Sequence, residues 1–244
     1  TPITDVEQLK FDVMNQLQNI ERGERVMIVV DSIGNLASKK EVEDALEQKS
    51  VGDMTRAKQI KSLFRMVTPH LTLKDVPMVV VNHTYMEIGM FPKAIVGGGT
   101  GSYYSADNIF IIGRQQEKDG SEIAGYNFII NVEKSRFVKE KSKIPVEVSW
   151  DEGISKWSGL MDMALESGHV IKPKAGWYQK VDTDTGEIED KSYRLNDTYH
   201  FSFWHPILQN KKFNEFIEKK YAVAAGAIMQ EDEVEDVYEE LDDA

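Results

Sequence analysis

Apolar residues at the start of the chain recur with a helical period. They are spaced three and four apart from Val6 to Ile20, which predicts an amphipathic helix. Thr4 and Glu7 have the spacing of a capping box, and Gly23 supplies a stop. The chain therefore opens with a helix that presents one face to a core.

Two unbroken apolar runs, 26–30 and 76–81, predict strands of one sheet. Neither run alternates with polar residues, and this favours parallel strands covered by helices on both faces. Between them a helical stripe predicts a long helix over 54–71, which Pro69 should disturb near its end. The order is typical of an α/β fold.

A loop of about 22 residues, 84–105, follows the second strand. Loops of this length inside compact domains are rare and tend to be functional. Further strands joined by short turns are then predicted, with Asp119-Gly120 in the first hairpin connection: 108–112, 126–132 and 144–150. Residues 1–152 therefore form an α/β domain with parallel strands first and hairpins afterwards.

The pattern changes after residue 152. A short helix over 158–167 precedes a β-like region with a turn at Asp184-Thr185-Gly186, and a last helix is predicted over 212–229. We expect a small α/β domain at 153–230 and a disordered acidic tail at 231–244.

Most of the net charge lies in that tail. The formal net charge is −12, and the last fourteen residues hold nine acidic residues and no basic one. Removing those nine leaves −3 for residues 1–230. The tail is either a solubilising end or a segment that competes with a polyanion, and composition leaves both readings open.

Composition excludes several classes of protein. The absence of cysteine rules out disulfide scaffolds and thiolate sites and is compatible with the cytosol. No apolar run approaches the roughly 18 residues of a membrane helix, and no export signal is seen. The chain begins at Thr1, and we expect it to be a piece of something longer.

Polar residues stand where both predicted parallel strands end. Asp31-Ser32 follows the first strand, where an aspartate can order a Mg²⁺ shell or simply cap the next segment. Asn82-His83 follows the second. His83 either hydrogen-bonds a terminal phosphate and signals to the loop, or is a strand-end histidine with its hydrogen bonds satisfied.

Anion-binding features surround these positions. The segment Gly97-Gly98-Gly99-Thr100-Gly101 lets backbone amides approach an anion, although no Gly-x-x-x-x-Gly-Lys-Ser/Thr pattern occurs in the chain. Two basic groups either bind phosphates or form solvated surfaces. They are Arg56, Lys58, Lys61 and Arg65, which avoid the apolar stripe of the long helix, and the cluster Lys134, Arg136, Lys139, Lys141 and Lys143.

Together these segments resemble the RecA-type recombinase family, and within it the UvsX group of large tailed phages. The resemblance rests on residues 31–40, 53–58, 97–101, 132–136 and 158–164, and it loosens after about residue 180. It implies the second half of a RecA-like P-loop NTPase core followed by a small α/β C-terminal domain.

The resemblance also implies roles for the candidate residues. Asp31 would act on Mg²⁺ through water, Ser32 would line the nucleotide site, and His83 would couple the ATP γ-phosphate to a DNA-binding loop at 84–102. RecA proper has glutamine at the position of His83. The residues nearest DNA would be Ile88, Phe91, Gly97, Gly98, Gly99, Thr100 and Gly101, together with Arg56, Lys58, Lys61 and Arg65 on the helix after a first DNA loop. Lys134 and Arg136 would reach the phosphates of a neighbouring subunit.

The activity implied is that of an ATP-dependent recombinase. It would form a helical filament on single-stranded DNA and pair it with homologous duplex DNA in recombination, repair and replication. The resemblance implies the host cytoplasm as its location and phage single-stranded-DNA-binding and recombination mediator proteins as its partners. The alternatives are a ring-forming RecA-fold replicative helicase and a non-catalytic interaction module. Nothing here corresponds to the family's phosphate-binding loop or catalytic glutamate, so we expect ATP hydrolysis only from the complete protein.

Overall fold

The computed structural model describes residues 2–48, 55–90, 94–119 and 122–223. The chain divides into two compact units, 1–111 and 112–244. This division falls inside strand β5 (Asn108–Asp119), whereas the sequence predicts domains at 1–152 and 153–230. Those domain limits stay a prediction, and the acidic tail lies outside the described residues.

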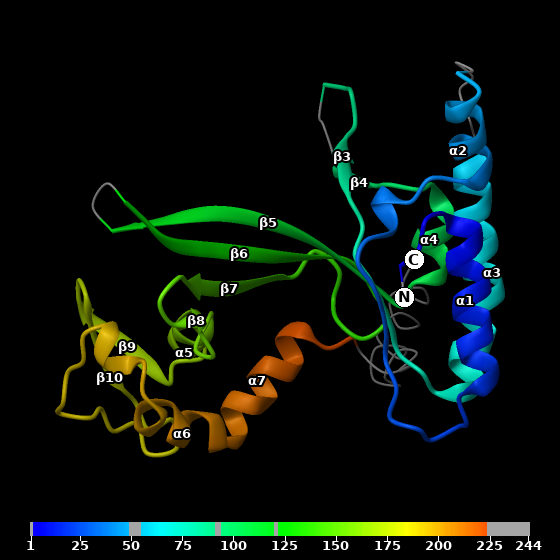
Figure 1. The fold of residues 1–244 in the computed structure, drawn as a ribbon. Helices are drawn as coiled ribbons and strands as arrows, with labels where there is room; N and C mark the ends of the chain where they lie inside the picture. The colour runs from blue at the N-terminus through cyan, green and yellow to red at the C-terminus, as the bar shows by residue number, and fades with distance from the viewer. Residues whose placement is uncertain (1, 49–54, 91–93, 120–121, 224–244) are drawn as a thin grey trace, which may run out of the picture. The chain divides into compact units, whose positions relative to one another are not determined.

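The first unit pairs two strands in parallel and packs helices on them (Figure 1). The parallel pair is the one predicted from the apolar runs. Its elements in chain order are α1 (Val6–Asn19), β1 (Ile28–Val30), the 3₁₀ turn η1 (Ile33–Asn35), α2 (Lys39–Leu46), α3 (Thr55–Lys74), β2 (Met78–Val80), β3 (Thr84–Met86), β4 (Ala94–Val96) and α4 (Thr100–Ser105).

Helices α1 and α3 lie side by side and supply most of the core of this unit (Figure 1). The predicted opening helix is confirmed, but its N-cap is Asp5, whose carboxylate accepts from the Gln8 amide at 2.8 Å, so the predicted Thr4–Glu7 capping box is wrong by one residue. The core residues share an apolar character and near-complete burial: Val6, Leu9, Val13, Leu17, Ile33, Ile60, Leu63 and Val67.

The predicted coverage of the strand pair on both faces is wrong for the described residues. Val30 points toward the core, while Val29 and Val79 are 61% and 48% exposed. Successive side chains of a strand point to opposite faces, and the helices α1 and α3 cover only one of them. An unbroken apolar run therefore leaves half of its residues open.

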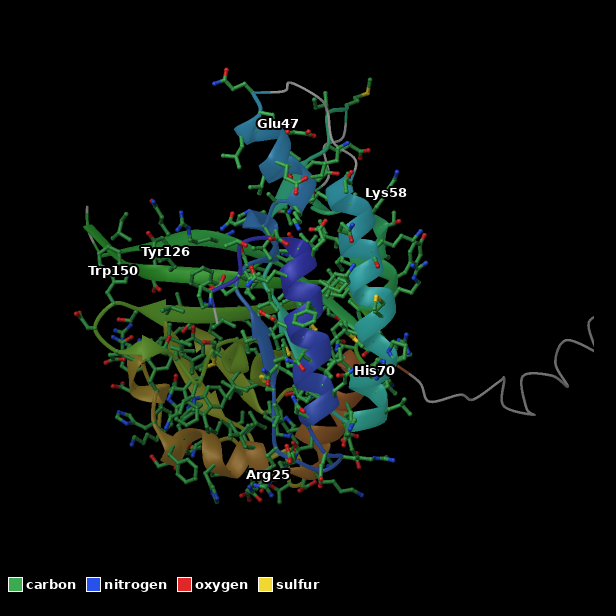
Figure 2. The ribbon with its side chains drawn as sticks, turned by 45° about the vertical axis from the view of Figure 1, so that its right-hand side comes forward. Arg25, Glu47, Lys58, His70, Tyr126 and Trp150 are labelled. Atoms are coloured by element: carbon green, nitrogen blue, oxygen red, sulfur yellow. The ribbon has the colours of Figure 1, made fainter. Side chains whose placement is uncertain are left out.

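Helix α3 is a single helix of 20 residues that continues through Pro69 to Lys74, so the predicted disturbance does not end it there. Figure 2 labels Lys58 in its first part and His70 in its last. At its far end the Lys74 Nζ donates to the Ile20 carbonyl at 2.7 Å, which satisfies the end of α1. This hydrogen bond joins the C-terminal end of α3 to the C-terminal end of α1.

The predicted loop 84–105 contains regular structure. Strands β3 and β4 pair antiparallel, with Tyr85 opposite Ile95, and α4 follows. Helix α4 packs closely on α3: a Cβ atom on Gly101 would lie 2.7 Å from the Cα of Lys61. Residues 91–93, between β3 and β4 in the chain, lie outside the described residues.

The second unit begins with an antiparallel sheet in the order β5-β6-β7-β8. The three predicted strands are confirmed as β5 (Asn108–Asp119), β6 (Glu122–Ser135) and β7 (Lys143–Ser149), with β8 (Gly153–Ile154) added. The first two are longer than the sequence indicates, and β7 is shifted by one residue. Tyr126 on β6 meets Trp150 edge-on, with ring centroids 6.2 Å apart (Figure 2).

A small helical and β-hairpin cluster completes this unit. It consists of α5 (Leu160–Glu166), β9 (Val170–Lys174), β10 (Trp177–Lys180), η2 (Asn196–Thr198), α6 (Phe201–Gln209) and α7 (Lys211–Tyr221). The predicted last helix 212–229 corresponds to α7, which ends at Tyr221; residues 224–229 lie outside the described residues. Helix α6 was not predicted, although it carries the buried Trp204 of this core.

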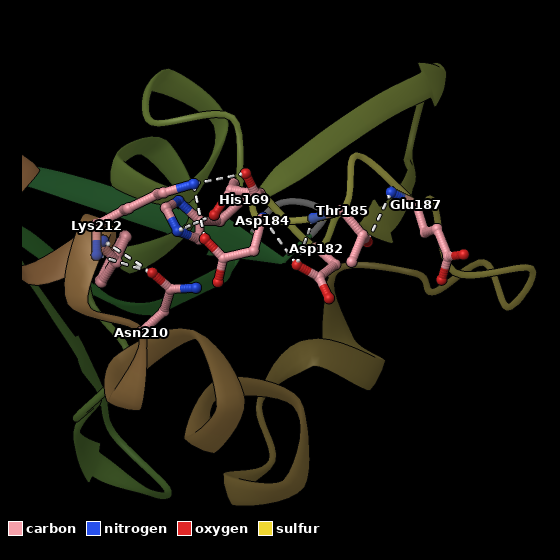
Figure 3. Close-up of polar contacts among 9 residues, drawn as sticks. His169, Asp182, Asp184, Thr185, Glu187, Asn210 and Lys212 are labelled. Carbon is pink, nitrogen blue, oxygen red and sulfur yellow. Dashed lines mark hydrogen bonds and ion pairs between the residues drawn. The ribbon is translucent and has the colours of Figure 1, made fainter.

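A buried histidine joins the elements of this cluster (Figure 3). His169 is 3% exposed, and its ring nitrogens lie 2.9 Å from the Ser167 hydroxyl and 3.2 Å from the Thr183 hydroxyl. The adjoining turn is the predicted one. Amide donation from Asp184 and then Thr185 to the Asp182 carboxylate lowers its pKa, and Lys212 bridges the turn to α7 by its ion pair with Asp184 at 2.7 Å.

No helix in the described part of the chain is both long and apolar enough to span a bilayer.

Substitution G101A is expected to destabilise the first unit by about 1–3 kcal/mol, because the new methyl group overlaps the backbone of α3. Thermal unfolding of the chain measures this, and G89A is the matched control because nothing lies within 4 Å of a Cβ on Gly89. Equal melting temperatures for G101A and G89A would contradict the close approach.

Substitution E147Q is expected to stabilise the second unit at pH 7. Burial, and then the negative charges of Glu117 and Asp162, raises the pKa of the Glu147 carboxyl above its ordinary value of 4.5. The folded state therefore disfavours the carboxylate, and wild-type stability falls as the pH rises through the raised pKa.

Melting temperatures should accordingly be higher for E147Q than for wild type at pH 7, with the difference shrinking below about pH 4.5, where the carboxyl is protonated in both states. The exposed Glu152 allows the control E152Q, which removes the same charge and should show no such pH-dependent gain.

Candidate functional site

The carboxyl ends of β1 and β2 lie at the same edge of the parallel pair. Val30 pairs with Val80, the Val81 amide donates to the Val30 carbonyl at 2.9 Å, and the Ile33 amide donates to the Val81 carbonyl at 3.0 Å. Asp31 and His83 therefore follow neighbouring strands at one edge, as the sequence predicts.

Asp31 presents a free carboxylate at this edge. It is exposed and forms no hydrogen bond or ion pair with any described residue, so it does not act as the cap that the sequence left open. The Asp31–Ser32 peptide bond is cis, and the Ser32 hydroxyl oxygen is buried without a hydrogen-bond partner among the described residues. Oxygen ligands of this kind fit a Mg²⁺ ion held through water. Within the described ranges no three acidic or histidine side chains gather into a metal cluster.

The imidazole of His83 lies against the segment that follows Asp31. A Cβ atom on Gly34 would lie 2.8 Å from the Nδ1 of His83, so only glycine leaves room for the ring. The ring is exposed, and neither nitrogen has a hydrogen-bond partner among the residues described. The alternative of a fully hydrogen-bonded histidine therefore does not hold for its side chain.

Asn82 ties this edge to the glycine segment. Its side-chain amide donates to the Gly97 carbonyl at 2.8 Å, and the Gly97 amide donates to the His83 carbonyl at 2.9 Å. Asn82 has no role predicted from the sequence. Its position at a strand end, beside His83, was the one available signal.

The β3–β4 hairpin starts directly after His83 and exposes apolar side chains. Ile88 is fully exposed and Met90 is 89% exposed. Phe91 lies outside the described residues. The exposure suits apolar wedges that enter a nucleic acid, and the DNA contacts assigned to Ile88 and Phe91 stay predictions.

The glycine segment packs on helix α3. A Cβ on Gly98 would lie 2.9 Å from the Ile60 Cδ1, and one on Gly99 would lie 3.7 Å from the Ala57 Cβ. Gly98 and Gly99 also have positive φ angles of 87° and 79°. These glycines, with Gly101, are thus required by close packing and by backbone conformation, a need that the sequence does not reveal. Anion contacts by this segment, including Thr100, stay a prediction.

Of the four basic residues predicted to avoid the apolar face of α3, Arg56 lies on that face. At about 100° per residue, Arg56 shares a side of the helix with Ile60 and Val67. Arg56 is half-buried, so the prediction that it avoids the apolar stripe is wrong. The error arises because Arg56 lies one turn before Ile60, the first buried residue of the helix. Lys58 and Arg65 are exposed on the opposite side and Lys61 is exposed at its border, where the sequence expects a polyanion groove or a wet face.

Lys134 and Arg136 belong to the second unit, where Lys134 is near the end of β6 and half-buried and Arg136 is exposed just beyond the strand. Their predicted contact with a neighbouring subunit's phosphates stays a prediction.

Two protein families match successive parts of the chain. Residues 4–155 match the RecA N-terminal domain family, and residues 157–217 match the C-terminal domain of the bacteriophage T4 recombination and repair protein. A "Recombination and repair protein" of Enterobacteria phage T4 is 53% identical over 245 residues, covering 99% of this chain and 62% of the phage protein.

Bacterial proteins are more distant relatives. Protein RecA of Bacteroides thetaiotaomicron is 28% identical over 167 residues, which cover 67% of this chain and 50% of that protein. Protein RecA of Arthrospira platensis is 24% identical over 230 residues, covering 92% of this chain and 59% of that protein. This chain thus spans between half and two thirds of the length of these relatives. Because the RecA N-terminal domain family matches more than half of it, this chain belongs to the RecA family, with a RecA-like α/β core followed by a small C-terminal domain.

Proposed function

We propose that this chain is part of an ATP-dependent DNA recombinase, which assembles as a filament on single-stranded DNA and exchanges strands with a homologous duplex. The observation that carries the proposal is the meeting of Asp31 and His83 at one sheet edge, with an exposed apolar hairpin beginning at the next residue. The phage T4 relative is named for recombination and repair. No relative given above is named as a helicase, so a ring-forming replicative helicase is not favoured.

Asp31 and Ser32 would hold Mg²⁺ through water, and the bound ion would neutralise charge on the phosphates of ATP. The free ring of His83 would meet the terminal phosphate. Since the carbonyl of His83 accepts from the Gly97 amide, a shift of His83 would move the glycine segment and with it the hairpin. In this way nucleotide state would reach the DNA-binding loop.

The DNA side would combine cations with apolar side chains. Lys58, Lys61 and Arg65 would neutralise backbone phosphates, while Ile88 and Phe91 would contact bases. Lys134 and Arg136 would complete the nucleotide site of a neighbouring copy, so that hydrolysis depends on the filament. Phage single-stranded-DNA-binding and mediator proteins would act as partners, in the host cytoplasm and during replication as well as repair.

In the complete protein, D31N is expected to lower DNA-dependent ATP hydrolysis by about 100-fold or more, because the amide cannot order the metal shell. Hydrolysis is measured by phosphate release and filaments by negative-stain microscopy. E24Q, an exposed position before β1 and thus at the opposite end of the strand, is the control and should hydrolyse ATP normally. Full activity of D31N, or closed rings in place of filaments, would overturn the proposal. The 244-residue chain alone is expected to hydrolyse no ATP, since it contains no Gly-x-x-x-x-Gly-Lys-Ser/Thr loop.

Deletion of residues 231–244 is expected to tighten DNA binding, most visibly at raised salt, because nine negative charges that compete with the phosphates are removed. Anisotropy of a labelled oligothymidine at several salt concentrations measures the effect. An unchanged affinity would instead favour a merely solubilising tail.

A further inference from the structure

Arg56 is committed to one short backbone segment. Its Nε donates to the Leu36 carbonyl at 2.6 Å, and its Nη2 donates to the carbonyls of Ile33 and Gly34 at 3.1 and 2.9 Å. No carboxylate among the described residues lies within 4.0 Å of the guanidinium. Among the described residues, all hydrogen bonds of this guanidinium therefore go to η1 and the residue after it.

The segment that Arg56 holds links Asp31 to the rest of the edge. It begins two residues after Asp31. The Ile33 amide donates to the Val81 carbonyl at 3.0 Å, and within the segment the Leu36 amide donates to the Ile33 carbonyl at 3.3 Å. A guanidinium that donates to three carbonyls fixes such a turn in one geometry. A lysine ammonium is a point charge on a flexible stem and cannot reproduce this planar fork.

The same segment supports His83. The Cα of Gly34 packs so closely against the imidazole that a methyl group would overlap Nδ1 and Cγ. The carbonyl of Gly34 is one of the acceptors of Arg56. A displacement of the guanidinium is thus passed through one residue to the ring of His83.

Helix α3 also contacts the glycine segment, which is itself hydrogen-bonded to residues 82 and 83. The glycine segment that is hydrogen-bonded to Asn82 and His83 packs on Ala57 and Ile60, within a little more than one turn of Arg56. Lys58 and Arg65 stand exposed on the opposite face of the same helix, and the exposed Lys61 lies at the border, beside Gly101. Phosphate contact by Lys58 and Arg65 is thereby separated from attachment to the nucleotide edge.

We propose that Arg56 is a positioning residue that couples DNA contact on α3 to the placement of His83, and that it does not itself bind DNA. This rests on the proposed function, since it requires that single-stranded DNA engage the exposed cations of α3. Movement of the helix under a bound phosphate backbone is carried by the guanidinium to residues 33–36 and from Gly34 to the imidazole.

The test uses the full 244-residue chain with labelled histidine, a fluorescein-labelled oligothymidine at low salt, and four proteins: wild type, R56A, R56K and R65A. Anisotropy gives the dissociation constant, and NMR gives the shift of the His83 ring signal, assigned with H83Q, between free and DNA-saturated protein. Melting curves establish that each variant is folded.

Wild type is expected to bind, with a shift of the His83 signal. R56A should bind with an affinity within about twofold of wild type but lose most of that shift, because no phosphate contact is removed while the link is broken. R56K, which keeps the charge but offers its donors from one nitrogen, should show a reduced shift, and it replaces R56A if the latter is unfolded. R65A should bind several-fold more weakly yet show the wild-type shift at saturation.

Three results would overturn the inference. A full His83 shift in both Arg56 variants would show that the coupling bypasses the guanidinium. A loss of affinity in R56A equal to that of R65A would make Arg56 a DNA contact. Failure of wild type to bind the oligonucleotide would remove the proposed DNA-binding function of this chain together with the inference, and is thus distinguishable from the other two.

Discussion

Three residue pairs, from Ile28 with Met78 to Val30 with Val80, hold β1 and β2 in parallel register. Parallel pairing brings like ends together, so the residues that follow each strand share one edge without any direct bond between their side chains. The edge is then shaped by what packs behind it. Helix α3 contributes Ile60, Leu63 and Val67 to the core beneath the strands and Arg56 to the turn at their end. Among the described residues, neither the Asp31 carboxylate nor the His83 ring forms a hydrogen bond that holds this edge together.

Much of this arrangement was predictable from the sequence. Strand ends are marked by the change from an apolar run to Asp31-Ser32 and Asn82-His83, and the helical period of the first residues is unambiguous. A helical connection between the two strands then favours parallel pairing. Helix α2 was missed because its segment is mostly polar, although Ser38 and Glu41 form a true capping box. The spacing of these two residues was the available signal for the helix, and it was overlooked.

Other features could not be predicted, because they depend on what lies across space. The glycines at 97–101 suggest an anion cradle, yet Gly98 and Gly101 face α3 at distances that only the folded chain defines. The helical period already places Arg56 on a different side of α3 from Lys58, but its carbonyl partners are visible only in the folded chain. The burial of His169 could not be predicted from the sequence either, because its two hydroxyl partners, Ser167 and Thr183, are ordinary loop residues.

Helix α3 is held at each end by a basic side chain on a backbone carbonyl: Arg56 near its first turn and Lys74, on the Ile20 carbonyl, at its last. The two anchors attach to opposite ends of the parallel pair, since residues 33–36 follow β1 and Ile20 precedes it. Sliding the helix along its axis would stretch one anchor while compressing the other. The two anchors together therefore oppose axial sliding of the helix and fix its register against the strands.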